Sequence, residues 1–156
     1  MLGTSQAGNV AEVTMKVVVR EGATTLSHRV IDRLRANADV EMVPLDEGVA
    51  DVIVDLRVGD HDGLARRHSS ATVEGEALME EVRRVNARRV VMLSSSLVYG
   101  PHVNSRIPIT EDEVIRPEAS FVFARQLSSV EHVLDRWRRG SDDRSVAVLR
   151  PTVTMG

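Results

Sequence analysis

The sequence predicts an α/β fold, a three-layer sandwich built on a five-stranded parallel sheet. Short apolar runs rich in β-branched residues alternate with segments whose apolar residues recur at helical spacing. This alternation is typical of parallel strands joined by crossover helices. The length of 156 residues suits one hydrophobic core. We therefore expect one domain over residues 15–156, preceded by a small, polar segment, residues 1–14, with the composition of a disordered tail or leader.

Each element is predicted from its own pattern of apolar residues. The expected strands are 16–20 (KVVVR), 40–44 (VEMVP), 51–56 (DVIVDL), 89–94 (RVVMLS) and 145–149 (SVAVL). The expected helices, each with an apolar stripe, are 25–36, 73–86 and a third that reaches residue 138. Ser120 is the expected N-cap of the third helix.

The order of the strands follows from the lengths of the connections. Only residues 45–50 separate the second and third strands, too few for the crossover that a parallel neighbour needs. The third strand is therefore expected on the other side of the first, which gives the order 2-1-3-4-5 with right-handed crossovers. Such a sheet has a switch point between strands one and three, where α/β proteins bind ligands.

Composition excludes several classes of function. The net charge is −3 and the chain has no cysteine. Nucleic acid and anionic membranes are not expected partners, because both favour a basic excess. Disulfides, thiolate metal sites and a cysteine nucleophile are excluded. The chain shows neither a signal peptide nor an apolar run long enough to cross a bilayer, so a cytoplasmic location is expected.

Two groups of charged residues, one around His61 and one of arginines, are interpreted as structural features of the surface. His61 lies between Asp60 and Asp62, but no second ligand pair follows at metal-site spacing, so no metal is expected. Arginines gather near the C-terminal ends of two expected helices, where cations suit the helix dipole. A phosphate-binding patch is the alternative for these arginines, which are Arg83, Arg84, Arg88, Arg89, Arg136, Arg138 and Arg139.

Three segments carry sequence motifs that follow one another along the chain: RRVVMLSSSLVYGP (88–101), PITEDEVIRPEAS (108–120) and VAVLRPTVTMG (146–156). Together with VEGEALMEEVRRVNARRVV (73–91), they resemble the extended short-chain dehydrogenases, the NAD-dependent epimerase/dehydratase family. That family shows a strand with S-S-x-x-V-Y-G, a loop of P-x-x-E and R-P-x-S character, and L-R-P-x-N-V-Y-G. The resemblance covers residues 15–156 and implies a Rossmann-like fold. It also implies that the family's C-terminal substrate-binding portion is absent from this sequence.

The cofactor-binding turn of the family is altered here. Active members carry T-G-x-x-G-x-x-G after strand one, because the backbone must approach the pyrophosphate closely. In ungapped register, Glu21, Thr24 and Ser27 replace the three glycines, and a shift by one residue matches only Gly22. Asp46 stands where a ribose-binding acid could stand, although an aspartate after a strand is ordinary turn chemistry. Gly22, Thr24, Ser27 and Asp46 are therefore weak, non-functional cofactor-binding candidates, and no cofactor is expected.

The cleft floor and the catalytic set also differ from the family pattern. The family's H-L-A-A after the third strand corresponds here to the bulkier, charged residues 55–58 (DLRV). Ser95, three residues before Val98, retains the family's substrate-orienting serine. Alignment of FARQLSSVE (123–131) with Y-A-R-S-K-L-A-A-E places Phe123 at the catalytic tyrosine and Leu127 at the lysine. Neither residue can perform acid/base chemistry, and Ser95 then has no matched base.

Three functional hypotheses follow from these replacements. The leading one is a non-catalytic epimerase/dehydratase-like domain with a structural, interaction or regulatory role, in a homodimer or beside other protein domains. The alternatives are an NAD(P)-binding, sugar-nucleotide epimerase/dehydratase-type oxidoreductase domain of a larger protein, and a phosphate or small-anion sensor at residues 24–27. The resemblance implies that a homodimer would form through the helices at 73–86 and 120–138.

Overall fold

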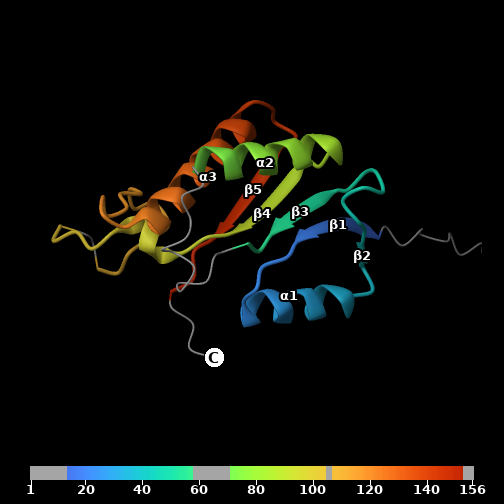
Figure 1. Cartoon of the computed structure of the whole chain (residues 1–156), viewed down its shortest axis with the longest axis horizontal. Coiled ribbons are helices and arrows are strands. Elements are labelled where there is room, and N and C mark those ends of the chain that lie inside the picture. Colours follow the sequence, from blue (N-terminus) through green and yellow to red (C-terminus); the bar gives the residue numbers. More distant parts are fainter. Residues whose placement is uncertain (1–13, 58–70, 105–106, 153–156) are drawn as a thin grey trace, which may run out of the picture.

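The computed structural model describes residues 14–57, 71–104 and 107–152 (Figure 1). They form a five-stranded parallel sheet in the order β2-β1-β3-β4-β5. Helix α1 lies on one face of this sheet, and helices α2 and α3 lie together on the other (Figure 1). The predicted fold class and strand order are thereby confirmed. Most of the predicted tail and the whole cluster around His61 lie outside the described residues.

The elements begin and end within two residues of the predicted positions. In chain order they are β1 (Met15–Arg20), α1 (Thr25–Arg35), β2 (Val40–Met42), β3 (Val52–Asp55), α2 (Ala71–Arg84), β4 (Arg89–Leu93), the 3-10 helix η2 (Ser96–Tyr99), α3 (Val122–Arg139) and β5 (Ser145–Leu149).

The predicted N-cap of α3 is wrong. Phe121 holds the cap position and provides no side-chain hydrogen bond to the first turn. The Ser120 hydroxyl instead donates to Glu118 Oε1 at 3.4 Å. The chain therefore enters the helix one residue later than expected, because the serine side chain bonds back toward the preceding loop.

Two clusters of buried apolar residues fill the space between the layers. The larger one joins α2 and α3 to the sheet and includes Leu78, Val82, Val130 and Leu134. A Cβ added at Gly75 would lie 3.2 Å from Val133 Cγ2, which shows how closely α2 approaches α3. The smaller cluster packs Ile31 of α1 against β1 and β3. The apolar stripes predicted for these helices therefore face the sheet.

Among the described residues, no helix has the length and apolar composition needed to span a membrane.

Candidate functional site

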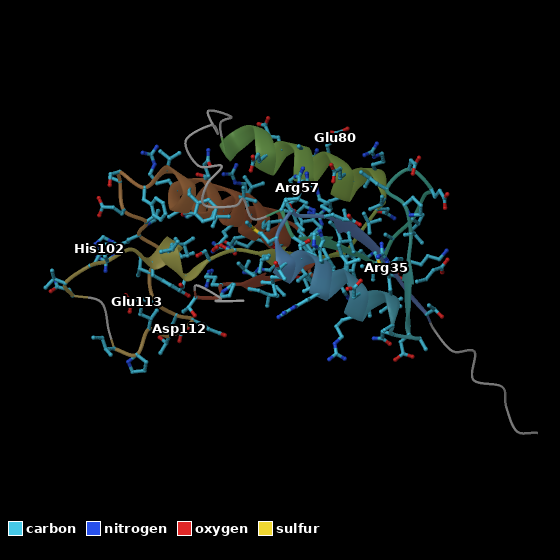
Figure 2. The ribbon with its side chains drawn as sticks, turned by 60° about the horizontal axis from the view of Figure 1, so that its bottom comes forward. Arg35, Arg57, Glu80, His102, Asp112 and Glu113 are labelled. Atoms are coloured by element: carbon cyan, nitrogen blue, oxygen red, sulfur yellow. The ribbon has the colours of Figure 1, made fainter. Side chains whose placement is uncertain are left out.

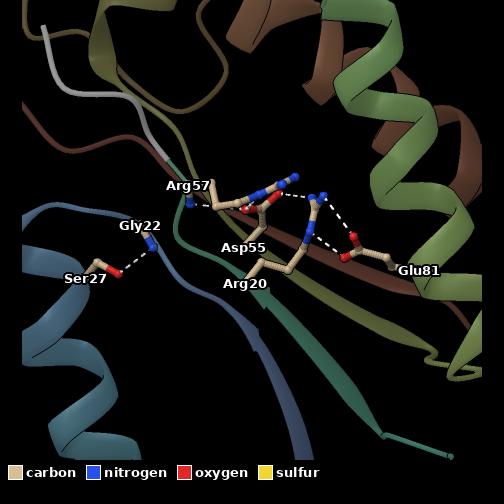
Figure 3. A network of polar contacts seen from close by, with 6 residues as sticks. All are labelled: Arg20, Gly22, Ser27, Asp55, Arg57 and Glu81. Carbon is tan, nitrogen blue, oxygen red and sulfur yellow. Dashed lines mark hydrogen bonds and ion pairs between the residues drawn. The ribbon is translucent and has the colours of Figure 1, made fainter. Parts of the chain in front are cut away.

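The switch point between β1 and β3 holds a buried network of charged side chains (Figure 3). Arg20 is the last residue of β1 and pairs in register with Asp55, the last residue of β3. Its Nη1 lies 2.5 Å from Asp55 Oδ2, and its Nε lies 2.5 Å from Glu81 Oε2 on α2. The side chains of Arg20 and Asp55 are 4% and 11% exposed. Arg20 therefore links both strands to α2 in a site with little access to water.

Arg57 completes this network from the chain that follows β3. Its backbone N–H donates to Asp55 Oδ1 at 3.1 Å, and its Nε lies 3.4 Å from the same oxygen. Both oxygens of Asp55 thus accept from arginine. The sequence analysis identified the altered residues after β3 but missed Arg20 and Glu81. The available signal was a charged residue that ends the otherwise apolar run VVVR.

Burial dominates the titration of Asp55. It raises the pKa of this carboxyl to about 6, from 3.8, and outweighs the charge and hydrogen bond of Arg20, which lower the pKa. The negative charges of Glu81 and Glu74 raise it further. The folded protein therefore binds a proton at Asp55 more tightly than the unfolded chain does.

The free energy of unfolding should decrease with rising pH because of this shift in the pKa of Asp55. As the pH rises from about 3.8 to about 6, Asp55 stays protonated only in the folded state, so stability falls by up to about 3 kcal/mol. An Asp55→Asn variant lacks this term. Its stability relative to the native protein should therefore increase across the same pH window, measured by urea unfolding. The exposed Asp46→Asn variant is the control, and a relative stability that falls with pH would contradict the prediction.

Of the four weak cofactor-binding candidates, the structure brings Gly22, Thr24 and Ser27 together in the turn before α1. The hydroxyl of Ser27 is fully buried and accepts from the Gly22 N–H at 2.9 Å. The Ser27 N–H in turn donates to Thr24 Oγ1 at 3.1 Å, which caps α1. Asp46 lies apart from them in an exposed turn after β2. The hydroxyls of the turn thus bind its own amide groups.

Gly22 is needed for packing between two strand ends. A Cβ added there would collide with the carbonyl oxygen of Leu56, just after β3. Gly22 therefore allows two segments of this chain to pack closely, and its presence does not require a bound ligand.

Phe123 and Leu127, which the sequence analysis matches to the family's tyrosine and lysine, lie in the hydrophobic core. Phe123 and Leu127, on consecutive turns of α3, are 3% and 8% exposed. Ser95 lies at the N-cap of η2, where its hydroxyl accepts from the Leu97 N–H at 3.3 Å. It acts as a helix cap in this structure.

A cavity of about 150 Å³ opens beside these residues. It is lined by both apolar and charged side chains. The lining residues come from β3, β4, α2, α3 and the chain after β3; they are Asp55, Arg57, Glu74, Met92, Leu93, Phe123, Gln126, Leu127 and Val130.

A second polar network joins the motifs that carry the family resemblance. Arg150, just after β5, donates to buried Glu131 of α3 through Nη2 at 2.8 Å and to the Tyr99 hydroxyl through Nη1 at 2.8 Å. Ser94 donates its hydroxyl to Glu131 as well. The carboxylate of Glu131 raises the pKa of Arg150. These residues hold η2, α3 and β5 together, which gives the V-Y-G and L-R-P motifs a structural role.

No group of three or more histidine, aspartate or glutamate side chains among the described residues could hold a metal ion.

Comparisons with known proteins place the chain among epimerases and dehydratases. The sequence model of the "NAD dependent epimerase/dehydratase family" matches residues 13–156. Among curated protein sequences, no match to the chain was found.

Solved structures share its fold at low sequence identity. RMD from Pseudomonas aeruginosa, complexed with NADPH, is 15% identical with a TM-score of 0.72, over 90% of this chain and 53% of its own. UDP-glucuronic acid 4-epimerase from Bacillus cereus, in complex with NAD, is 15% identical with a TM-score of 0.66, over 88% and 56%. UDP-N-acetylglucosamine 4-epimerase from Methanobrevibacter ruminantium is 19% identical with a TM-score of 0.66, over 88% and 54%. The chain thus spans about half the length of these structures.

Proposed function

Because the chain belongs to the NAD-dependent epimerase/dehydratase family, we propose that it is a non-catalytic member with a structural, interaction or regulatory role. The observation that carries this proposal is the burial of Phe123 and Leu127 in the core, at the positions that match the family's tyrosine and lysine. A phenyl ring has no ionisable proton and an isobutyl group carries no charge. Neither can replace the proton transfer and the phenolate stabilisation that the family requires.

The residues at the switch point do not fit a dinucleotide. A pyrophosphate needs free backbone N–H groups and small side chains at the start of α1. Here the Gly22 N–H already donates to Ser27 Oγ, and the Ser27 N–H already donates to Thr24 Oγ1. Glu21 adds an exposed carboxylate to the same turn, which would repel phosphate. These contacts support the proposal that the domain functions without NAD(P).

The first experiment is a calorimetric titration of the chain with NAD⁺, NADH, NADP⁺ and NADPH. We expect no measurable heat of binding, because the amides of Gly22 and Ser27 are already bonded within the turn and Glu21 presents a carboxylate there. RMD from Pseudomonas aeruginosa, whose structure contains NADPH, is the positive control. A micromolar dissociation constant for any dinucleotide would contradict the proposal and favour the oxidoreductase alternative. Binding of inorganic phosphate alone would favour the anion sensor.

We also propose that two copies associate through the outer faces of α2 and α3. Support comes from a groove of about 880 Å³ between the helices. Glu76 and Glu80 lie on its α2 side, and His132 and Arg136 lie on its α3 side. The side chain of Glu80 points outward in Figure 2. A two-fold axis can set these opposite charges against each other.

Light scattering tests this association. We expect a dimer for the native chain and a shift toward monomer for Arg136→Glu, which places a like charge opposite the α2 carboxylates. Arg35→Glu on α1 makes the same charge change away from the groove and should leave the dimer intact. A native chain that stays monomeric at its highest soluble concentration would contradict the proposal.

A further inference from the structure

The cavity beside Phe123 and Leu127 is lined by both apolar and charged side chains. We propose that it binds a small organic cation, an ammonium group carried on an apolar body about the size of a benzene ring. This ligand class goes beyond the proposed non-catalytic role and does not depend on it.

The floor of the cavity sets the size and character of the ligand body. Met92, Phe123, Leu127 and Val130 line it, and all four are buried apolar residues. A volume of about 150 Å³ is enough for one six-membered ring, since an apolar cavity of that size in another protein binds benzene. Removing such a ring from water against apolar side chains is favourable.

The charges around the cavity set the sign of the ligand. Arg57, Asp55 and Glu74 line it, and Arg20 pairs with both Asp55 and Glu81. Among the residues that the structure describes here, two guanidinium groups thus face three carboxylates, so their ionised side chains carry one excess negative charge. An anionic ligand would add a fourth negative group to a largely desolvated site, whereas an ammonium restores neutrality.

Glu74 is the carboxylate available to the ligand. Both oxygens of Asp55 already accept from arginine, and Glu81 pairs with Arg20 through both of its oxygens. Glu74 forms no hydrogen bond or ion pair with any other residue that the structure describes. Its place in the first turn of α2 also favours a negative charge through the helix dipole. The experiment must therefore distinguish a Glu74 that binds a ligand from a Glu74 that interacts only with solvent and the helix dipole.

The test is an NMR titration of the full chain, observing methyl groups of Met92 and Leu127. The probes are benzylamine, which is a cation at neutral pH, and benzoate and benzyl alcohol, which share its ring. We expect saturable shifts with benzylamine and none with benzoate. Glu74→Gln should weaken benzylamine binding about tenfold, as the loss of one charge-assisted hydrogen bond predicts. Glu41→Gln, an exposed charge change on β2 at the far edge of the sheet, should have no effect.

Three results would overturn the proposal. They are equal affinity for benzylamine and benzoate, equal weakening by Glu74→Gln and Glu41→Gln, and the absence of saturable methyl shifts with benzylamine. None of them bears on the non-catalytic role, because the calorimetric titration measures binding of a dinucleotide and not of an amine.

Discussion

Replacing Arg20 with methionine is expected to lower the free energy of unfolding by about 3–5 kcal/mol. The side chain of Arg20 is almost fully buried and pairs with Asp55 and Glu81. Methionine preserves much of its aliphatic length but leaves Glu81 without a cationic partner and Asp55 with Arg57 alone, in a site with little access to water. The cost of an unpaired buried charge far exceeds the net value of the original pairs.

Urea unfolding followed by circular dichroism measures this effect. Arg35→Met is the matched control, because Arg35 pairs with Asp32 only at 4.0 Å on the exposed surface of α1 (Figure 2). That change should cost less than about 1 kcal/mol. If Arg20→Met fails to fold, the triple variant with Asp55→Asn and Glu81→Gln should fold again, because it removes both carboxylate charges that Arg20 neutralises. Equal costs for the two single variants would contradict the prediction.

Restoring the family's catalytic pair, by Phe123→Tyr with Leu127→Lys, is expected to produce no turnover. The two positions lie four residues apart on α3, so the new phenol and ammonium would share one helix face. Hydride transfer still requires a nicotinamide held close to the substrate, and positioning contributes a large part of such catalysis. The double variant leaves Arg20, Asp55 and Arg57 in place at the switch point, where a cofactor would have to bind.

The same double variant should be less stable by about 2 kcal/mol, because the apolar contacts that Leu127 makes in the core are lost. A dinucleotide-dependent absorbance assay with a panel of sugar nucleotides measures turnover, and a melting curve measures stability. Phe123→Tyr alone separates the phenol from the charge. Turnover without any change to the turn at residues 21–27 would show that the chain retains a cofactor site.

The sequence by itself predicts the elements, their order in the sheet and the loss of the catalytic pair. These predictions depend on information that is local along the chain. The period of apolar residues determines whether a segment is a strand or a helix, and the short link at residues 45–50 excludes a crossover. The replacements at Phe123 and Leu127 are predicted from the spacing of residues within one helix.

Only the tertiary structure decided what occupies the switch point and which face each helix stripe covers. Arg20 and Glu81 are 61 residues apart, and Arg150 and Tyr99 are 51 apart. No periodicity relates such positions, because a pair forms only when two elements pack with their side chains in reach. The burial that raises the pKa of Asp55 also comes from several elements at once. Desolvation depends on the whole surrounding volume, which the neighbours of a residue along the chain do not determine.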